Sequence, residues 1–448
     1  MVITFVTVLH HEVWSDEAQA WVLVRDTSFI ELIKLVRIEG HPLLWYFLIM
    51  PFAKIINSFN AIMSMQILNW LLVIIGMGIF VFKSPFCKMI KFVVLFSSGI
   101  LYWYPVVARS YCLIPILIFL LAILYPKQKE HPFGYVALLI LLANTHSIMF
   151  GFCAALGLVF AYNCFKTKNK ANYLAVIIGT ISAIFIISYL WGSWNENLVV
   201  RTLPHTTGFA GIRIAFDELT KNIYGYSNIL CYILLIIFLI FSSVIFFIKD
   251  KKIFFTYISS ILYQFLIYIY CWGVIPHRAY TPVLITIFCF WTMKDVFQDK
   301  CLQKVINTVF VIVLLLAIKN GIEHCIRDIF FEHSGGKAAA KYIIDNIPEN
   351  AFILVNESFT SVSISAYIPE NKTKWKFYSD INKDFYTYIK YKKAQFISLY
   401  DIKKYLQKHK NIYVILCKSS FKYIEPIYKS DKNIHSKEIF EIYNLQDY

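Results

Sequence analysis

Apolar runs separated by short polar connections make up most of the first 319 residues. They fall near residues 61–82, 92–105, 110–125, 132–144, 147–165, 172–191, 225–248, 253–272, 279–294 and 305–319. A helix that crosses the hydrocarbon core of a bilayer needs about 20 apolar residues, and several of these runs are shorter. Together with the apolar start of the chain, the pattern predicts a polytopic α-helical membrane protein with about 11 transmembrane helices.

The apolar start itself is short. Residues 1–9 would reach only about 14 Å as a helix, which is half of the hydrocarbon core. We therefore expect this helix either to continue through Val13 and Trp14 or to be part of a longer first helix.

Composition supports the membrane interpretation. Of the 448 residues, 58% are hydrophobic and 16% are charged, whereas about a quarter of a soluble chain is charged. The mean hydropathy is +0.59. The net charge of +15 would suit a nucleic-acid partner, but many of the lysines lie in short clusters between apolar runs. Because membrane insertion produces such clusters, we expect a lipid bilayer as partner and no nucleic acid.

Five lysine clusters fall in alternate connections. They are Lys83, Lys88 and Lys91; Lys127 and Lys129; Lys166, Lys168 and Lys170; Lys249, Lys251 and Lys252; and Lys294, Lys300 and Lys304. Since positively charged connections stay cytoplasmic, the other connections and residues 320–448 are expected outside. This alternation requires that residues 42–56, interrupted by Pro51 and Lys54, do not cross the membrane. A missed helix elsewhere would also restore the alternation.

Unusual polar residues gather in the connections predicted to face outward. The first, residues 10–60, contains Asp16, Glu17, Arg25, Asp26, Glu31, Lys34, Arg37, Glu39 and His41. The later ones contribute Arg109, Asn144, His146, Trp191, Trp194, Asn195, Glu196, Arg201, His205, His277 and Arg278. Each alone is typical of an ordinary polar loop or of a membrane interface. Together they indicate a polar cavity that faces outward.

The last third of the chain has a different pattern. GKAAAKYIIDNI (336–347) and LYDIKKYLQKHK (399–410) predict helices, and AFILVN, SVSISAY, AQFIS, IYVILC and EIFEIYNL predict strands. We expect residues 320–448 to form a small extracytoplasmic α/β domain. It contains neither a G-x-G-x-x-G sequence nor a P-loop, so no nucleotide cofactor is expected. The ten cysteines of the chain include no C-x-x-C pair, which argues against a zinc site or a disulfide framework.

A carboxylate pair beside arginine and histidine suits the transfer of a sugar from a lipid phosphate. Arginine binds phosphate through paired N–H donors, and a carboxylate can take the proton of an acceptor hydroxyl. A nearby negative charge also stabilises the oxocarbenium character of the transition state. Asp16 is the candidate base. Glu17 is a second catalytic candidate that orients a partner or stabilises the start of the following helix.

Several sequence features together resemble the GT-C membrane glycosyltransferases. They are the short first helix, the pair Asp16 and Glu17, G-H-P-L-L-W-Y at 40–46, A-R-S-Y at 108–111, T-H at 145–146 and the outer domain. The nearest resemblance is to the protein O-mannosyltransferase-like and aminoarabinose-transferase-like families. It implies a polyprenyl-phosphate sugar donor, Asp16 as base, and substrate contacts from His41, Arg109, Tyr111, His146, Arg201, His277 and Arg278.

The chain departs from that resemblance in two respects. Its first helix is too short for the pattern, and the second departure concerns metals. Where some relatives have a second acidic residue, the stretch 102–111 offers Arg109 and no carboxylate. We therefore expect transfer without a metal ion or other cofactor.

These predictions describe an inverting glycosyltransferase of the cytoplasmic (inner) membrane. Residues 1–319 form its transmembrane domain, residues 10–60 its catalytic outer loop, and an envelope lipid, glycan or protein is the acceptor. Two alternatives stay open. One is a transporter or flippase of lipid-linked sugars, which favours internal repeats. The other is a non-catalytic envelope assembly protein that acts through residues 320–448.

Overall fold

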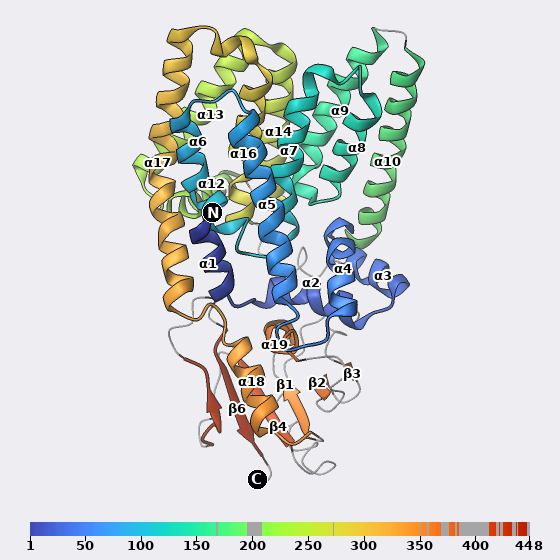
Figure 1. Ribbon diagram of the computed structural model, residues 1–448, viewed down its shortest axis with the longest axis vertical. Coiled ribbons are helices and arrows are strands. Elements are labelled where there is room, and N and C mark those ends of the chain that lie inside the picture. The colour runs from blue at the N-terminus through green and yellow to red at the C-terminus, as the bar shows by residue number, and fades with distance from the viewer. Residues whose placement is uncertain are drawn as a thin grey trace.

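The structure, a computed structural model, is a long helical bundle with a small domain at one end (Figure 1). It describes residues 1–166, 169–194, 208–271, 273–349, 351–355 and 358–368, together with shorter pieces of the C-terminal domain. These pieces are residues 376–380, 383–384, 412–417, 421, 424–431, 436 and 438–445.

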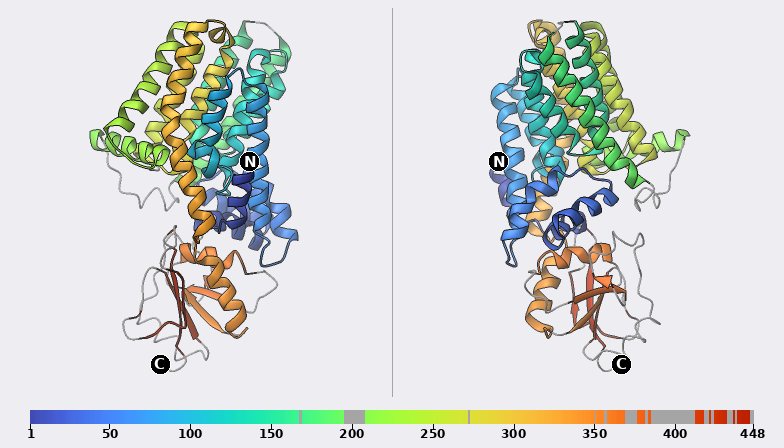
Figure 2. Two further views of the ribbon diagram at one scale, coloured as in Figure 1. Left: turned by 60° about the vertical axis from the view of Figure 1, so that its left-hand side comes forward. Right: turned by 90° about the vertical axis from the view of Figure 1, so that its right-hand side faces the viewer.

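The bundle is built from ten main helices. They are α5 (Met63–Lys83), α6 (Lys88–Phe96), α7 (Leu113–Leu124), α8 (Pro132–Ala143), α9 (Phe150–Phe165), α10 (Lys170–Trp194), α13 (Ile229–Lys249), α14 (Lys251–Tyr270), α16 (Thr281–Thr292) and α17 (Lys300–Phe330). Short helical turns join them: η1 (Gly99–Trp103), η2 (Ser110–Cys112), η3 (Tyr125–Lys127), η4 (Ser147–Met149), α15 (Pro276–Ala279) and η5 (Lys294–Phe297). Helix α12 (Gly208–Tyr224) lies across the others at the lower end of the bundle (Figure 2).

Seven helical segments in the described part of the chain are long and apolar enough to cross a membrane. They are Met63–Lys83, Ser110–Lys127, Ser147–Phe165, Lys170–Trp191, Ile229–Lys249, Lys251–Tyr270 and Lys300–Phe330. Two shorter apolar helices, Leu44–Ile55 and Pro132–Ala143, do not reach that length. The fold is thus compatible with a helical membrane protein, while the count of about 11 spans and a GT-C fold stay predictions.

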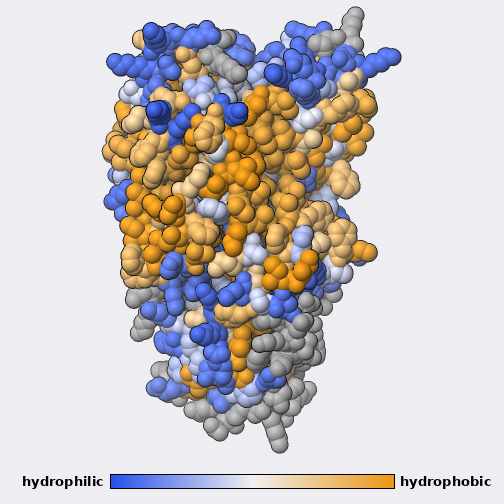
Figure 3. Space-filling view, in the orientation of Figure 1, coloured by the Kyte–Doolittle hydropathy of each residue, from blue (hydrophilic) through white to orange (hydrophobic). Residues whose placement is uncertain are grey.

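The surface of the bundle is apolar. Ile181, Phe185 and Ile240 are 62%, 70% and 59% exposed, and on the face shown in Figure 3 an orange band crosses the middle of the molecule between two more hydrophilic ends. Apolar surface on this scale is unfavourable in water and favourable in lipid.

Lysine-rich connections and the C-terminal domain lie at opposite ends of the bundle. The connections α5–α6, α7–α8, α9–α10, α13–α14 and α16–α17 lie at its upper end, and the small domain lies below it (Figure 1). Helix α4 (Leu44–Ile55) lies at the lower end beside α2 (Ser15–Asp26) and α3 (Phe29–Glu39). Its twelve residues span only about 18 Å, less than a bilayer core.

Helix α1 (Val2–His10) ends before Val13 and Trp14, although the sequence allowed it to continue through them. His11 is already extended, with φ −64° and ψ 125°, so the expected continuation through Val13 and Trp14 is wrong. The polypeptide bends there because α2 begins anew after Trp14, with Asp16 and Glu17 in its first turn. Gly40, at φ 75°, ends α3 in the left-handed conformation that glycine adopts at little cost.

The described part of the C-terminal domain contains a mixed six-stranded sheet in the order β3-β2-β1-β4-β6-β5, flanked by helices. Its elements are α18 (Gly336–Asn346), β1 (Phe352–Val355), α19 (Ser358–Ser365), β2 (Lys376–Asp380), β3 (Lys383–Asp384), β4 (Ile412–Cys417), β5 (Tyr428–Lys429) and β6 (Phe440–Asn444). Strand β1 pairs in parallel with β2 and β4, and β6 pairs antiparallel to β4. The predicted helix at 336–347 and the strands at 351–356, 412–417 and 438–445 are confirmed, whereas AQFIS and LYDIKKYLQKHK lie outside the described residues.

The strand predicted over SVSISAY is wrong, because this segment forms α19. Its alternation of serine with valine and isoleucine resembles a half-buried strand, yet residues 361–368 are all buried. At the end of α19, the Arg25 guanidinium of α2 donates to the carbonyl oxygens of Ser365 (2.9 Å) and Ile368 (2.7 Å). This contact with α2 therefore provides hydrogen-bond donors for the carbonyl oxygens at the end of α19. The sequence pattern of the segment could not indicate that contact.

Candidate functional site

The first turn of α2 carries both candidate catalytic carboxylates. Acidic residues are favourable at a helix N-terminus, where backbone N–H groups lack partners within the helix. Glu17 Oε2 accepts from the backbone N–H of Trp14, 3.4 Å away, and so stabilises this start. Asp16 and Glu17 then diverge, because successive side chains on a helix are rotated by about 100°.

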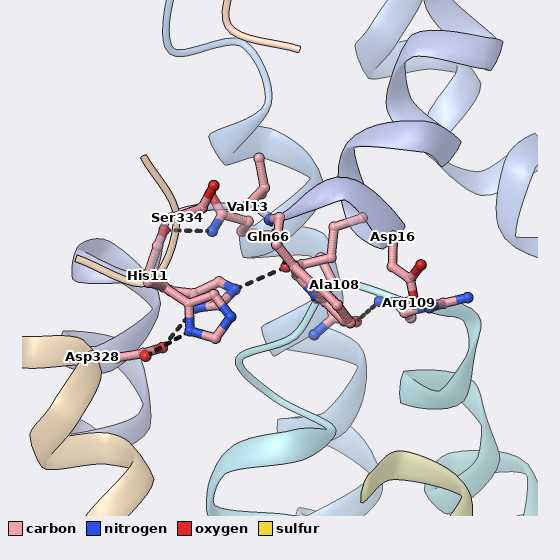
Figure 4. A network of polar contacts seen from close by, with 12 residues as sticks. His11, Val13, Asp16, Gln66, Ala108, Arg109, Asp328 and Ser334 are labelled. Carbon is pink, nitrogen blue, oxygen red and sulfur yellow. Dashed lines mark hydrogen bonds and ion pairs between the residues drawn. The ribbon is translucent and has the colours of Figure 1, made fainter. Parts of the chain in front are cut away.

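Asp16 forms an ion pair with Arg109 (Figure 4). The two side chains are 25% and 13% exposed, so both remain partly accessible. The segment that carries Arg109 is held by Asn69 of α5, whose side-chain oxygen accepts from the Arg109 backbone N–H (3.2 Å). The Asn69 side-chain amide donates to the carbonyl oxygens of Tyr104 and Pro105 at 2.8 and 3.0 Å.

Glu39 is a third carboxylate beside this ion pair. Its oxygens accept from Gln19 Nε2 at 3.0 Å and from the Tyr46 hydroxyl at 2.5 Å. Burial raises the pKa of Glu39, while these hydrogen bonds and the charge of Arg109 oppose that rise. In the sequence, Glu39 was part of the charged loop and was not predicted for the site. The signal that could have indicated it is the position of Glu39 directly before G-H-P-L-L-W-Y.

A group of aromatic and imidazole rings adjoins the arginine. Tyr111 stacks on His146 at a centroid distance of 4.7 Å and contacts His277 at 4.4 Å. His41 lies 5.4 Å from His146, again between ring centroids. Arg278 Nε donates to the Tyr111 hydroxyl at 2.9 Å.

Burial and the neighbouring positive charges keep these imidazoles neutral. Burial, together with the charges of Arg109 and Arg278, lowers the pKa of His41 to about 3. The same causes lower the pKa of His277 well below its ordinary value. The two arginines are therefore the fixed positive charges of this group, and the histidines supply uncharged hydrogen-bonding groups near neutral pH.

Most of the residues predicted for the site thus lie in one neighbourhood. Through ring contacts, hydrogen bonds and mutual electrostatic effects, the fold joins Asp16, His41, Arg109, Tyr111, His146, His277 and Arg278. Arg201 lies outside the described residues. Glu17 is the exception, since it points away from this group and is fully buried.

Glu17 belongs instead to a second, buried network. Its Oε2 lies 2.9 Å from His11 Nε2, and its Oε1 accepts from the backbone N–H of Ala108 at 2.5 Å. His11 Nδ1 lies 2.6 Å from Asp328 Oδ2 at the end of α17 (Figure 4). Although burial opposes the charged imidazole, Glu17 and Asp328 raise the pKa of His11 to about 10.

Two more groups complete this network on the Asp328 side. His333 Nδ1 lies 3.0 Å from Asp328 Oδ1, and the Tyr102 hydroxyl donates to Asp328 Oδ2 at 2.7 Å. Asp328 and His333 were not predicted for the site, because the change in composition after residue 319 suggested a domain boundary there, whereas α17 runs to Phe330. The available signal was an aspartate and a histidine five positions apart at that change in composition.

An apolar cavity of about 350 Å³ lies between α8, α9 and α10. Its lining includes Leu139, Ala143, Phe150, Gly157, Val176 and Ile187. Along the chain, the lining residues Ala143 and Phe150 flank the short segment that carries His146.

Comparisons with known proteins found no match: no protein-family model, no curated protein and no solved structure matches the chain.

Proposed function

We propose that this protein is an inverting glycosyltransferase that moves a sugar from a polyprenyl-phosphate donor to a cell-envelope acceptor at the outer face of the cytoplasmic membrane. The observation that carries the proposal is the partly accessible Asp16–Arg109 pair, adjoined by a second arginine and three buried rings. A base and a phosphate-binding cation then lie side by side, as this transfer requires.

Arg109 and Arg278 bind the donor phosphate in this proposal. Arginine offers planar, paired donors that match phosphate oxygens. Arg109 neutralises Asp16 while the site is empty, and an arriving phosphate competes with Asp16 for the guanidinium. Binding of the donor therefore releases the carboxylate that the next step needs. The neutral rings of His41 and His277 add hydrogen bonds without adding charge.

Asp16 then acts as the general base. It takes the proton of the acceptor hydroxyl as the acceptor oxygen forms a bond to the anomeric carbon. The bond from that carbon to the phosphate oxygen breaks on the opposite face, and the lipid phosphate leaves with the electron pair. This single displacement inverts the anomeric centre and forms no covalent sugar–enzyme intermediate.

The surroundings of Asp16 also favour a cation from the protein over a metal ion at this point. Arg109 already provides a positive charge there, and both oxygens of the nearby Glu39 accept hydrogen bonds from Gln19 and Tyr46. The apolar cavity between α8, α9 and α10 is the proposed place for part of the polyprenyl chain, because its described lining is almost entirely hydrocarbon.

A transfer assay tests the proposal directly. Purified protein in lipid vesicles is given a radiolabelled sugar on polyprenyl phosphate and an extract of envelope acceptors. We expect labelled product and free polyprenyl phosphate, with inverted configuration at the anomeric carbon. A flippase would move the donor across the bilayer without consuming it, and a non-catalytic assembly protein would do neither; either result contradicts the proposal.

The proposed orientation, with the C-terminal domain outside and the lysine-rich end in the cytoplasm, can be tested separately. Cys301 is exposed at the lysine-rich end of α17, and Asn346 is exposed at the end of α18 in the C-terminal domain. In intact cells, a membrane-impermeant maleimide should label Asn346→Cys and leave the native Cys301 unlabelled until lysis. The reverse order of labelling would place the C-terminal domain in the cytoplasm.

A further inference from the structure

His11, Asp328 and His333 form a compact cluster at the junction of the bundle and the C-terminal domain. They come from the α1–α2 connection, the end of α17 and the connection from α17 to α18. One nitrogen or oxygen from each lies within 4.8 Å of the others. All three residues are at least 95% buried, at 3%, 2% and 5% exposure.

The donor set matches what a transition metal requires. Two imidazole nitrogens and one carboxylate are common ligands of Zn²⁺, with bonds of about 2.0–2.2 Å. His11 Nδ1 and His333 Nδ1 already face the two oxygens of one carboxylate, at 2.6 and 3.0 Å. Two ligand atoms at that distance from a tetrahedral ion lie about 3.3 Å apart or slightly more, so binding requires each imidazole nitrogen to move away from the carboxylate by only about 1 Å or less.

The groups around the cluster match the usual support of a metal site. A metal-bound histidine normally donates its second ring N–H to a carboxylate, which fixes the ring orientation. Glu17 Oε2 stands 2.9 Å from His11 Nε2 and can accept that hydrogen bond. The Tyr102 hydroxyl donates to Asp328 Oδ2, the oxygen that His11 Nδ1 also faces, and so helps to orient the carboxylate.

We propose that His11, Asp328 and His333 bind a divalent transition-metal ion, for which Zn²⁺ is the best match, and that this ion ties the C-terminal domain to the start of α2. The ion takes the place of the proton that His11 Nδ1 shares with Asp328. It lies outside the sugar-transfer residues and takes no part in the chemistry proposed for Asp16. Glu17 connects the two sites, because it also accepts from the backbone N–H of Ala108, which precedes Arg109.

Metal analysis of the full-length protein tests this inference independently of any transfer activity. The protein is purified in detergent without a polyhistidine tag, and its metal content is measured by mass spectrometry. We expect about one equivalent of Zn²⁺ or another divalent transition metal per chain. His333→Ala and Asp328→Asn should lose it. His10→Ala is the matched control, since His10 is exposed beside His11 and should retain the metal.

A second measurement decides the matter even if the ligand variants do not fold. The wild-type protein is treated with a chelator and then titrated with Zn²⁺ alone, while its melting temperature is recorded. We expect the melting temperature to fall on chelation and to recover at one equivalent, because ligands that bind only the folded state stabilise it. Wild-type protein that carries no metal, binds no Zn²⁺ and melts unchanged would show that the cluster is a hydrogen-bonded network only. Equal metal content in His333→Ala and His10→Ala would also overturn the site.

Discussion

Asp16 and Glu17 are neighbours in the first turn of α2, yet their carboxylates lie in two different regions. Asp16 faces a partly accessible group in which Arg109 is its ion-pair partner. Glu17 is completely buried and bonds to His11 and to the backbone of Ala108. The first region is partly accessible, as the proposed substrate site must be, whereas the second is enclosed by the protein.

The difference shows how one acidic pair can serve two purposes. A rotation of about 100° between consecutive helical residues directs one carboxylate to the site and the other to the junction with the C-terminal domain. A base must be accessible to its substrate, while a carboxylate that positions a loop is more effective when buried and fully bonded. We therefore expect variants of the two residues to fail in different assays.

The largest effect is expected from Asp16→Asn. The variant keeps the size of the side chain but removes the base, and loss of a general base costs about 10² to 10⁴ in rate. Sugar transfer should fall by that factor, while donor binding stays at least as strong because Arg109 is released. The matched control, Asp26→Asn at the end of the same helix, should keep its transfer rate. Near-normal transfer by Asp16→Asn would locate the base elsewhere.

Glu17→Gln should act mainly on stability. Removing one partner of a buried charged network costs about 3–5 kcal/mol, because the remaining charges stay buried. We expect a lower melting temperature in detergent and, in the protein that remains folded, a smaller loss of transfer than in Asp16→Asn. Both variants are compared with Glu31→Gln on α3, which lies outside the network. A Glu17→Gln protein of normal stability but no activity would make Glu17 a catalytic residue after all.

Arg109→Lys and Arg278→Lys should weaken donor binding. Each keeps its charge but loses the planar pair of donors, and a hydrogen bond to a charged group contributes about 1.5–3 kcal/mol. We expect the dissociation constant for the polyprenyl-phosphate donor to rise by about 10- to 100-fold. Arg37→Lys, at an exposed position of α3, is the control. Unchanged donor binding in both variants would remove these arginines from the proposed site.

The smallest effect concerns pH. The pKa of His41 is lowered to about 3 in the folded protein, so between that value and the ordinary value of 6.5 the unfolded chain binds a proton that the folded chain does not. Stability should therefore decrease as the pH falls from 7 to 5. The partly exposed ring contributes about 1 kcal/mol of this loss.

His41→Asn should reduce that loss, whereas His131→Ala, at an exposed histidine of the α7–α8 connection, should leave it intact. Melting temperatures recorded across this pH range measure the slope. The interpretation of His41 as a ring that stays neutral in the folded protein fails if both variants follow the wild-type curve.

Local sequence patterns predicted much of the fold. Long apolar runs predicted the helices that are long and apolar enough to cross a membrane, because nearly every residue of a helix inside a bilayer has to be apolar. Strands β1 and β4 were predictable because buried strands are near-continuous apolar segments, whereas β6 includes Glu441 among its apolar residues. Segment 361–367 was not predictable, because its partners in α2 lie more than 300 residues away and decide whether its backbone is helical.

The sequence by itself determined that this chain has helices suited to a membrane, a charged loop with an acidic pair, and cationic residues in several later connections. Only the tertiary structure decided which of those residues meet. It joined Asp16 to Arg109 across 93 positions and His11 to Asp328 across 317 positions. The physical reason is that the long apolar helices depend mainly on nearby residues and on solvent, whereas α19 and the site depend on distant partners. The direction of each carboxylate depends on which distant helices pack against it, and no local pattern records that packing.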